Sequence, residues 1–120
     1  MRVLALGGSG GMGRATVRAA LTYDFVTEIV VAGIDGELAE RFVASLNDPR
    51  VRNLSLDITD SQALRQAMDS VDVVLNSTGP FFRFGVPILT AAIEAGKHYC
   101  DICDDWLPTL QMLALSEQAL

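Results

Sequence analysis

A cluster of glycines near the N-terminus has the spacing that binds the phosphates of a dinucleotide. Gly8, Gly10 and Gly13 form the pattern G-x-G-x-x-G, after the apolar run 3–6 and before the alanine-rich segment 14–21. Between a strand and a helix, such glycines permit a tight turn, let the backbone approach a pyrophosphate, and allow close packing. The phosphates would then lie at the positive end of the helix dipole, although a glycine turn can also serve packing alone. The candidate cofactor-binding residues of this loop are Gly8, Ser9, Gly10, Gly11, Met12 and Gly13.

Small and polar residues follow the other expected strands, at the edge where a parallel sheet binds ligands. Asp35 can accept hydrogen bonds from the 2′-hydroxyl of an adenosine ribose and repel a 2′-phosphate, or it can cap the next helix. Asp57 can accept a hydrogen bond from the adenine amino group, or lie in a solvated turn. Asn76 and Thr78 can contact the ribose on the nicotinamide side, or satisfy backbone groups at a strand end. The candidate cofactor-binding residues of this edge are Asp35, Asp57, Ile58, Asn76, Ser77, Thr78 and Gly79.

Apolar runs typical of strands alternate with segments typical of helices along the whole chain. The expected strands are 3–6, 28–33, 51–56, 71–75 and 98–102. The expected helices are 14–21, 37–46, a segment that follows Thr59 and ends near 68, a segment from about 86 to 95, and 108–120. This alternation predicts right-handed crossovers and a doubly wound parallel sheet. The sequence therefore predicts a single α/β domain over residues 1–120, a Rossmann fold with strand order 3-2-1-4-5.

Two local signals mark the starts of helices. Thr59 and Gln62 have the spacing of a capping box, and Pro87 suits the first turn of a helix. Under this interpretation three phenylalanines lie in the loop before the fourth helix, as core or interface residues: Phe81, Phe82 and Phe84.

The overall composition narrows the class of protein and of partner. Half of the 120 residues are hydrophobic and the mean hydropathy is +0.31, which suits a sheet buried on both faces. The net charge of −6 argues against nucleic acid and against an anionic membrane as partners. No apolar run approaches the roughly 18 residues of a membrane span, and the N-terminal run is too short for a signal peptide. We therefore expect a cytoplasmic protein without a metal site, in which Cys100 and Cys103 are ordinary thiols.

Four segments beyond the glycine loop resemble the saccharopine dehydrogenase family: DITD at 57–60, NSTGPF at 76–81, GVP at 85–87 and GKHYCD at 96–101. The pattern N-x-x-G-P-[FY] followed by G-x-H-Y-x-D is fairly specific to this family, and the likeness covers nearly the whole chain. The resemblance implies an oxidoreductase that uses NAD or NADP to make or break C–N bonds, or to reduce other substrates. It also implies that this domain binds the nucleotide, while a C-terminal domain supplies most of the substrate site and the dimer contacts.

Two departures from the family pattern bear on function. Gly33-Ile34 stand where the family often has Asp-Arg or Gly-Arg, so the arginine that would bind a 2′-phosphate is missing. NAD is therefore slightly favoured over NADP as the cofactor. Asp104-Asp105 stand where the family usually has Gly-Glu, so substrate contacts are not carried over and no catalytic residue is assigned.

The C-terminal end of the chain falls where the second domain of the family should begin. This predicts an N-terminal domain that binds the dinucleotide, takes a small-molecule substrate only with the second domain, and does not turn over alone. The apolar C-terminal segment predicts an exposed surface that can pair two copies into a homodimer. The alternative function belongs to another class: a stand-alone module that binds NAD(H) or ATP and regulates a partner.

Overall fold

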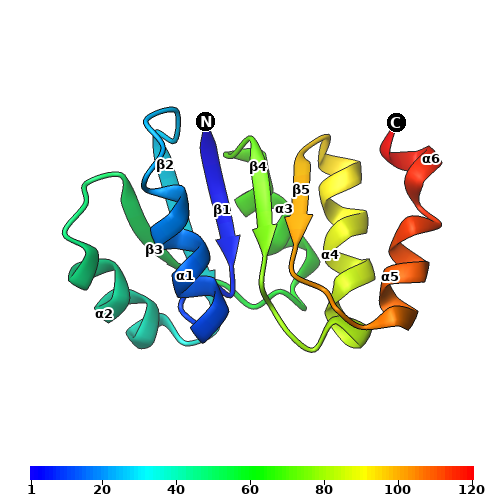
Figure 1. Ribbon diagram of the computed structural model, residues 1–120, viewed down its shortest axis with the longest axis horizontal. Helices are drawn as coiled ribbons and strands as arrows, with labels where there is room; N and C mark the ends of the chain where they lie inside the picture. Colours follow the sequence, from blue (N-terminus) through cyan, green and yellow to red (C-terminus); the bar gives the residue numbers. More distant parts are fainter.

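Five parallel strands form one sheet in the structure, a computed structural model that describes residues 1–120. The strands are β1 (Arg2–Leu6), β2 (Glu28–Gly33), β3 (Val51–Ser55), β4 (Val73–Asn76) and β5 (His98–Asp101). Their order across the sheet is β3-β2-β1-β4-β5, which confirms the predicted Rossmann topology (Figure 1). Because all strands are parallel, their carboxyl ends meet at one edge, the lower edge in Figure 1.

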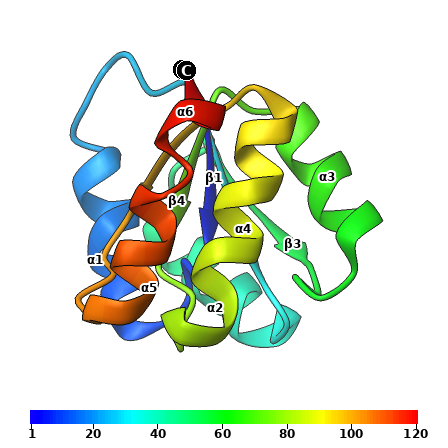
Figure 2. The ribbon, with the colours of Figure 1, turned by 90° about the vertical axis from the view of Figure 1, so that its right-hand side faces the viewer.

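Helices cover both faces of the sheet. They are α1 (Gly11–Ala20), α2 (Gly36–Leu46), α3 (Ser61–Asp69), α4 (Phe81–Ala95), α5 (Trp106–Leu113) and α6 (Ser116–Ala119). One core lies under α1 and α2, and the other lies under α3 and α4 (Figure 2). Helix α5 packs against α4 beyond the edge strand β5. None of the helices is both long and apolar enough to cross a membrane.

Strand β1 shows why the strands of this sheet appear in the sequence as continuous apolar runs. Successive side chains of a strand point to opposite faces. Val3 and Ala5 join the core under α1 and α2, whereas Leu4 and Leu6 join the core under α3 and α4. All four side chains are buried. A strand covered on both faces has no polar side, so the four covered residues of β1 are all apolar, and only the exposed Arg2 at its start is polar.

Helix α4 begins earlier than the sequence predicts. It starts at Phe81 and not near Val86, so the prediction that the three phenylalanines lie in a loop is wrong. The extended Pro80 is the N-cap, and its carbonyl accepts two N–H groups of the first turn at 3.1 Å. Pro87 therefore lies inside the helix, where proline costs about 3 kcal/mol relative to alanine. The face that packs on the sheet offsets this cost through its buried residues, Phe81, Gly85, Ile88 and Ala92.

Three other helix boundaries differ from the prediction. Helix α1 begins at Gly11, because the end of the glycine motif forms its first turn. Helix α3 is capped by Asp60, whose carboxylate accepts a backbone N–H at 3.1 Å. The hydroxyl of Thr59 is bound to Asp57 at 2.6 Å, so the predicted capping box is wrong. The predicted last helix is split into α5 and α6, since Leu115 forms a turn between them.

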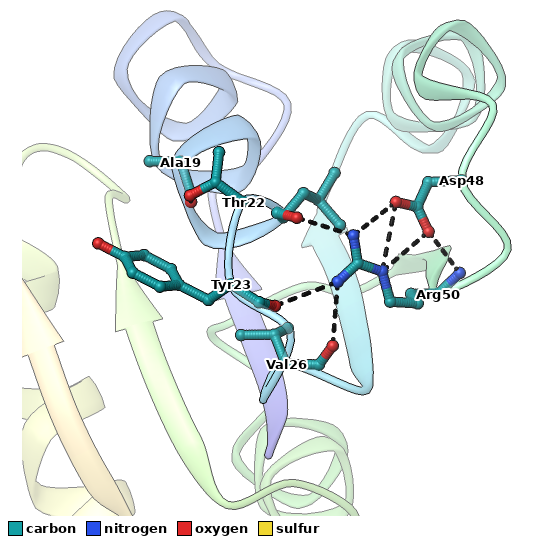
Figure 3. A network of polar contacts seen from close by, with 7 residues as sticks. Ala19, Thr22, Tyr23, Val26, Asp48 and Arg50 are labelled. Carbon is teal, nitrogen blue, oxygen red and sulfur yellow. Dashed lines mark hydrogen bonds and ion pairs between the residues drawn. The ribbon is translucent and has the colours of Figure 1, made fainter.

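Arg50 joins two loops at the amino edge of the sheet, the connection between α1 and β2 and the connection between α2 and β3. Its guanidinium donates hydrogen bonds to the backbone carbonyls of Leu21 at 2.8 Å and Val26 at 3.1 Å (Figure 3). It also pairs with the Asp48 carboxylate at 2.8 Å, and these hydrogen bonds lower the pKa of that carboxyl. The network holds the connection between α1 and β2 against the start of β3. Its role is therefore structural, because it lies at the edge opposite the glycine turn.

Candidate functional site: the carboxyl edge of the sheet

The turn after β1 is held by backbone bonds that require a glycine. Gly7 has a φ of +72°, a conformation that other residues rarely adopt. Its N–H donates to the carbonyl of Ala32 on β2 at 2.9 Å, and its own carbonyl accepts the N–H of Gly10 at 3.0 Å. A Cβ atom at Gly7 would also lie 3.0 Å from the backbone of Ser77, at the end of β4. The turn is thus fitted between the ends of β2 and β4.

The glycines of this turn fall into two sets that differ in what a side chain would meet. A Cβ at Gly13 would overlap the carbonyl oxygen of Gly7, and a Cβ at Gly8 would lie 3.0 Å from the carbonyl oxygen of Ala5. Gly8 and Gly13 therefore serve packing. A Cβ at Gly10 would meet nothing closer than 3.4 Å, and one at Gly11 would meet nothing within 4 Å. Packing of the domain does not explain why the second pair lacks side chains.

The N-terminus of α1 is open to an anion. The backbone N–H groups of Gly11, Met12 and Gly13 have no acceptor within the chain, and the first turn contains no acidic residue. Free N–H groups and the helix dipole together favour a phosphate or carboxylate at this point. The loop that leads into the helix is fixed by Arg14, whose Nε donates to the carbonyl of Ser9 at 2.8 Å. The site is therefore preorganised before any ligand binds.

Two clefts lie on either side of this helix N-terminus and share Gly10, Ser77 and Gly79 in their walls. The first, which we call the β2–β3 cleft, has a volume of about 580 Å³ and includes Asp35, Asp57, Ile58, Thr78, Arg83 and Phe84. The second, the β4–β5 cleft, has a volume of about 450 Å³ and includes Met12, Phe81, Ile102 and Asp104. A long ligand with a central diphosphate could reach into both clefts from the N-terminus of α1.

The two predicted carboxylates line the β2–β3 cleft and are also bound within the chain. Asp35 is the N-cap of α2, and its Oδ1 accepts the N–H of Leu38 at 3.0 Å. Asp57 accepts the hydroxyl and the N–H of Thr59 at 2.6 and 2.9 Å, and these bonds lower the pKa of its carboxyl. In each case the bonds within the chain are made by Oδ1. Capping and ligand binding are therefore compatible at Asp35, and the contacts with ribose and adenine stay predictions.

Asn76 is buried behind the two clefts and lines neither of them. Its side chain is 1% exposed; the amide oxygen accepts the N–H of Thr78 at 2.9 Å, and the amide nitrogen donates to Tyr99 at 3.0 Å. The Tyr99 hydroxyl donates to Asp101 at 2.8 Å. Burial is the main cause of the raised pKa of this phenol. This network ties the end of β5 to the loop after β4.

The structure brings most of the predicted cofactor-binding residues to the two clefts. Those that line one cleft or both are Ser9, Gly10, Gly11, Met12, Gly13, Asp35, Asp57, Ile58, Ser77, Thr78 and Gly79. Gly8 and Asn76 are buried behind them. Sequence reasoning missed Arg83 and Phe84, because they were assigned to a loop. A helix start at Pro80 would have placed both residues in a first turn that faces the carboxyl edge.

A family comparison agrees with this geometry. The family model described as saccharopine dehydrogenase NADP binding domain matches residues 3–119. The chain belongs to this family. It is therefore an NAD(P)-binding Rossmann domain of the kind found in saccharopine dehydrogenase-like oxidoreductases, as the sequence motifs predicted.

Two curated proteins resemble this family member over 83% of its length. One is a trans-acting enoyl reductase from Mycobacterium leprae, 26% identical over 103 residues. The other is a "probable mitochondrial saccharopine dehydrogenase-like oxidoreductase" from Arabidopsis thaliana, 30% identical over 111 residues. The chain spans 24% of the length of each of these relatives.

Solved structures confirm the fold. Saccharopine dehydrogenase (L-Glu forming) from Saccharomyces cerevisiae matches 98% of this chain with a TM-score of 0.77, at 20% identity and over 24% of its own length. WbmG from Bordetella bronchiseptica, solved in complex with NAD, matches 84% of this chain with a TM-score of 0.67, at 20% identity and over 36% of its own length. At these identities the likeness concerns the fold alone.

Proposed function

We propose that this domain binds NAD(H) or NADP(H) across the carboxyl edge, within an oxidoreductase that acts on an amino-acid-like or imine substrate. The pyrophosphate would accept the free N–H groups of 11–13, with the adenosine half in the β2–β3 cleft and the nicotinamide half in the β4–β5 cleft. The bound nicotinamide would supply the hydride chemistry. The observation that carries the proposal is the pair Gly10 and Gly11. Packing does not require their lack of side chains, and they lie at an unpaired helix N-terminus between the clefts.

Calorimetric titration of the purified chain with NAD⁺, NADH, NADP⁺ and NADPH tests the proposal directly. We expect dissociation constants between about 1 μM and 1 mM, which correspond to roughly −8 to −4 kcal/mol. Absence of binding by all four nucleotides at millimolar concentration would reject the proposed function. A stand-alone regulatory module is not favoured by any specific observation, whereas the family match favours an oxidoreductase.

A mild preference for NAD over NADP is expected, because Asp35 lines the cleft where the adenosine ribose is proposed to lie. Its neighbour Ile34, which stands in place of an arginine, is 79% exposed and brings no positive charge. Asp35→Asn keeps an N-cap side chain but removes the carboxylate charge, so the ratio of the two dissociation constants should move toward one. Asp60→Asn makes the same change at the cap of α3, outside the cleft, and should leave the ratio unaltered. Clearly tighter binding of NADP by the unmodified chain would contradict the prediction.

This chain alone is expected not to catalyse hydride transfer. A substrate must be held at about 3–3.5 Å from the reacting carbon and shielded from water. Both clefts are open at the surface. Large apolar side chains of α5 remain exposed, with Trp106 at 74% and Leu113 at 63%. The absorbance of the reduced nicotinamide, followed with saccharopine, with lysine plus 2-oxoglutarate and with imines, is expected to show no sustained change. Sustained turnover by the purified chain would overturn this prediction.

The exposed surface of α5 also leads us to propose that the isolated chain forms homodimers at high concentration. Sedimentation velocity over a range of concentrations would measure this. A purely monomeric boundary at every concentration would contradict the proposal.

A further inference from the structure

Arg83 is the cationic residue that lines the β2–β3 cleft. It lies in the first turn of α4, with its guanidinium carbon 4.9 Å from the centre of the Phe84 ring. Phe84 is half-buried and packs against the core under α3 and α4, so it is a fixed support. The arginines that form ion pairs are others: Arg2, Arg41, Arg50, Arg52 and Arg65. Arg83 therefore forms no ion pair within the chain, and the contact given for its guanidinium is the one with the Phe84 ring.

The position of Arg83 along the cleft indicates which part of a dinucleotide it would meet. With the diphosphate at the N-terminus of α1 and the ribose beside Asp35, the adenine base lies beyond the ribose, near the end of β3. Arg83 is at this end, because it also lines the neighbouring groove between α3 and α4, together with Ile58 and Thr59. That groove does not include Asp35 or the glycine turn. Arg83 thus groups with Ile58 and Thr59, at the end of the cleft where the base is proposed to lie.

The chemistry of the side chain fits an aromatic base. A guanidinium is planar, and it stacks on aromatic rings more readily than an ammonium does. The Arg83 guanidinium carbon lies over the Phe84 ring, and Arg83 is exposed, so its guanidinium is accessible to a ligand. Resting on the proposed function, we infer that Arg83 binds the adenine ring of the cofactor by stacking. It is a ligand-binding residue that acts equally on NAD and NADP, because both carry the same base.

The experiment compares Arg83→Ala with the unmodified chain by calorimetry, using NAD⁺, NADP⁺, AMP and nicotinamide mononucleotide. Loss of one stacking partner is expected to weaken binding of NAD⁺, NADP⁺ and AMP by about 5- to 10-fold each. Nicotinamide mononucleotide carries no adenine, so its binding should not change. Arg83→Lys keeps the charge but not the planar group. On a logarithmic scale, its loss of affinity should be about half of the loss seen with Arg83→Ala. Arg41→Ala, which removes an exposed arginine outside both clefts, should match the unmodified chain.

Three results would overturn the inference. If the unmodified chain binds NAD⁺ and Arg83→Ala binds it equally well, Arg83 does not contact the ligand, while the proposed function stands. If Arg83→Ala loses affinity for NADP⁺ alone, Arg83 binds the 2′-phosphate and does not stack on the base. If the unmodified chain binds none of the four nucleotides, the proposed function fails, and the inference fails with it. A thermal melt of Arg83→Ala that matches the unmodified chain ensures that a loss of binding is not a loss of fold.

Discussion

Replacing Gly10 with valine is expected to abolish dinucleotide binding while the domain stays folded. The backbone at Gly10 has a φ of −76°, which valine can adopt, and a Cβ there would lie 3.4 Å from its nearest neighbour, the carbonyl oxygen of Gly7. Valine is a poorer N-cap than glycine, which costs on the order of 1 kcal/mol of stability. The branched side chain would, however, occupy the space in front of the free N–H groups of α1. We expect affinity for NAD⁺ to fall by about 100-fold or more, a loss of at least about 2.7 kcal/mol.

Calorimetry with NAD⁺ measures the loss of binding, and a circular dichroism melt measures the stability of the same variant. The matched control is Ala19→Val, which places the same side chain near the other end of α1, at an exposed position. This control should bind NAD⁺ as tightly as the unmodified chain. Equal binding by Gly10→Val would mean that the glycine turn does not hold the diphosphate, and the proposed placement of the cofactor would be rejected.

Replacing Gly13 with alanine is expected to destabilise the fold, even though alanine favours helices. The added Cβ would overlap the carbonyl oxygen of Gly7 and would lie 2.7 Å from the Cα of Gly8. Both neighbours are backbone atoms of the turn, which is held to β2, so neither can rotate away. Overpacking typically costs 1–3 kcal/mol, and a backbone clash belongs at or above the upper end. We expect the free energy of unfolding to fall by about 3 kcal/mol, a large share of the 5–15 kcal/mol typical of a domain.

Urea unfolding followed by circular dichroism would measure this change. Gly11→Ala is the matched control, because it adds the same methyl group two positions earlier in the same turn, where nothing lies within 4 Å. The control should be as stable as the unmodified chain or slightly more stable, since alanine is a better helix former than glycine. Equal unfolding midpoints for the two variants would show that α1 can move away from the turn at little cost.

The two glycine substitutions together separate binding from packing. Gly10→Val should lose the ligand and keep the fold, whereas Gly13→Ala should lose stability first. A glycine turn that served packing alone would also lose stability at Gly13, but Gly10→Val would then bind the nucleotide no more weakly than the unmodified chain. The comparison therefore decides between the two interpretations of the motif that its spacing leaves open.

The sequence by itself determined the architecture and the location of the candidate site. Apolar runs such as 28–33 show a strand buried on both faces, because no polar side alternates with the apolar one. Alternation of strands and helices implies right-handed crossovers, and the glycine motif after the first strand indicates a Rossmann domain, whose strand order is the one observed. Because the carboxyl ends of parallel strands meet at one edge, Asp35 and Asp57 could be assigned to the same region as the glycine turn. These inferences need only local patterns and the chirality of the chain.

Only the tertiary structure decided the surroundings of each residue at that edge. All glycines lack a Cβ atom, so the sequence alone could not distinguish their surroundings. The structure shows that a Cβ at Gly13 would meet a backbone carbonyl, whereas a Cβ at Gly10 would meet nothing closer than 3.4 Å. The start of α4 also depended on packing. Local propensity places Pro87 in a first turn, but the burial of a whole helix face outweighs the cost of one interior proline. Because α4 starts at Phe81, Arg83 belongs to its first turn and lines the cleft. Its position therefore depends on where the helix starts, which the neighbouring residues in the sequence did not reveal.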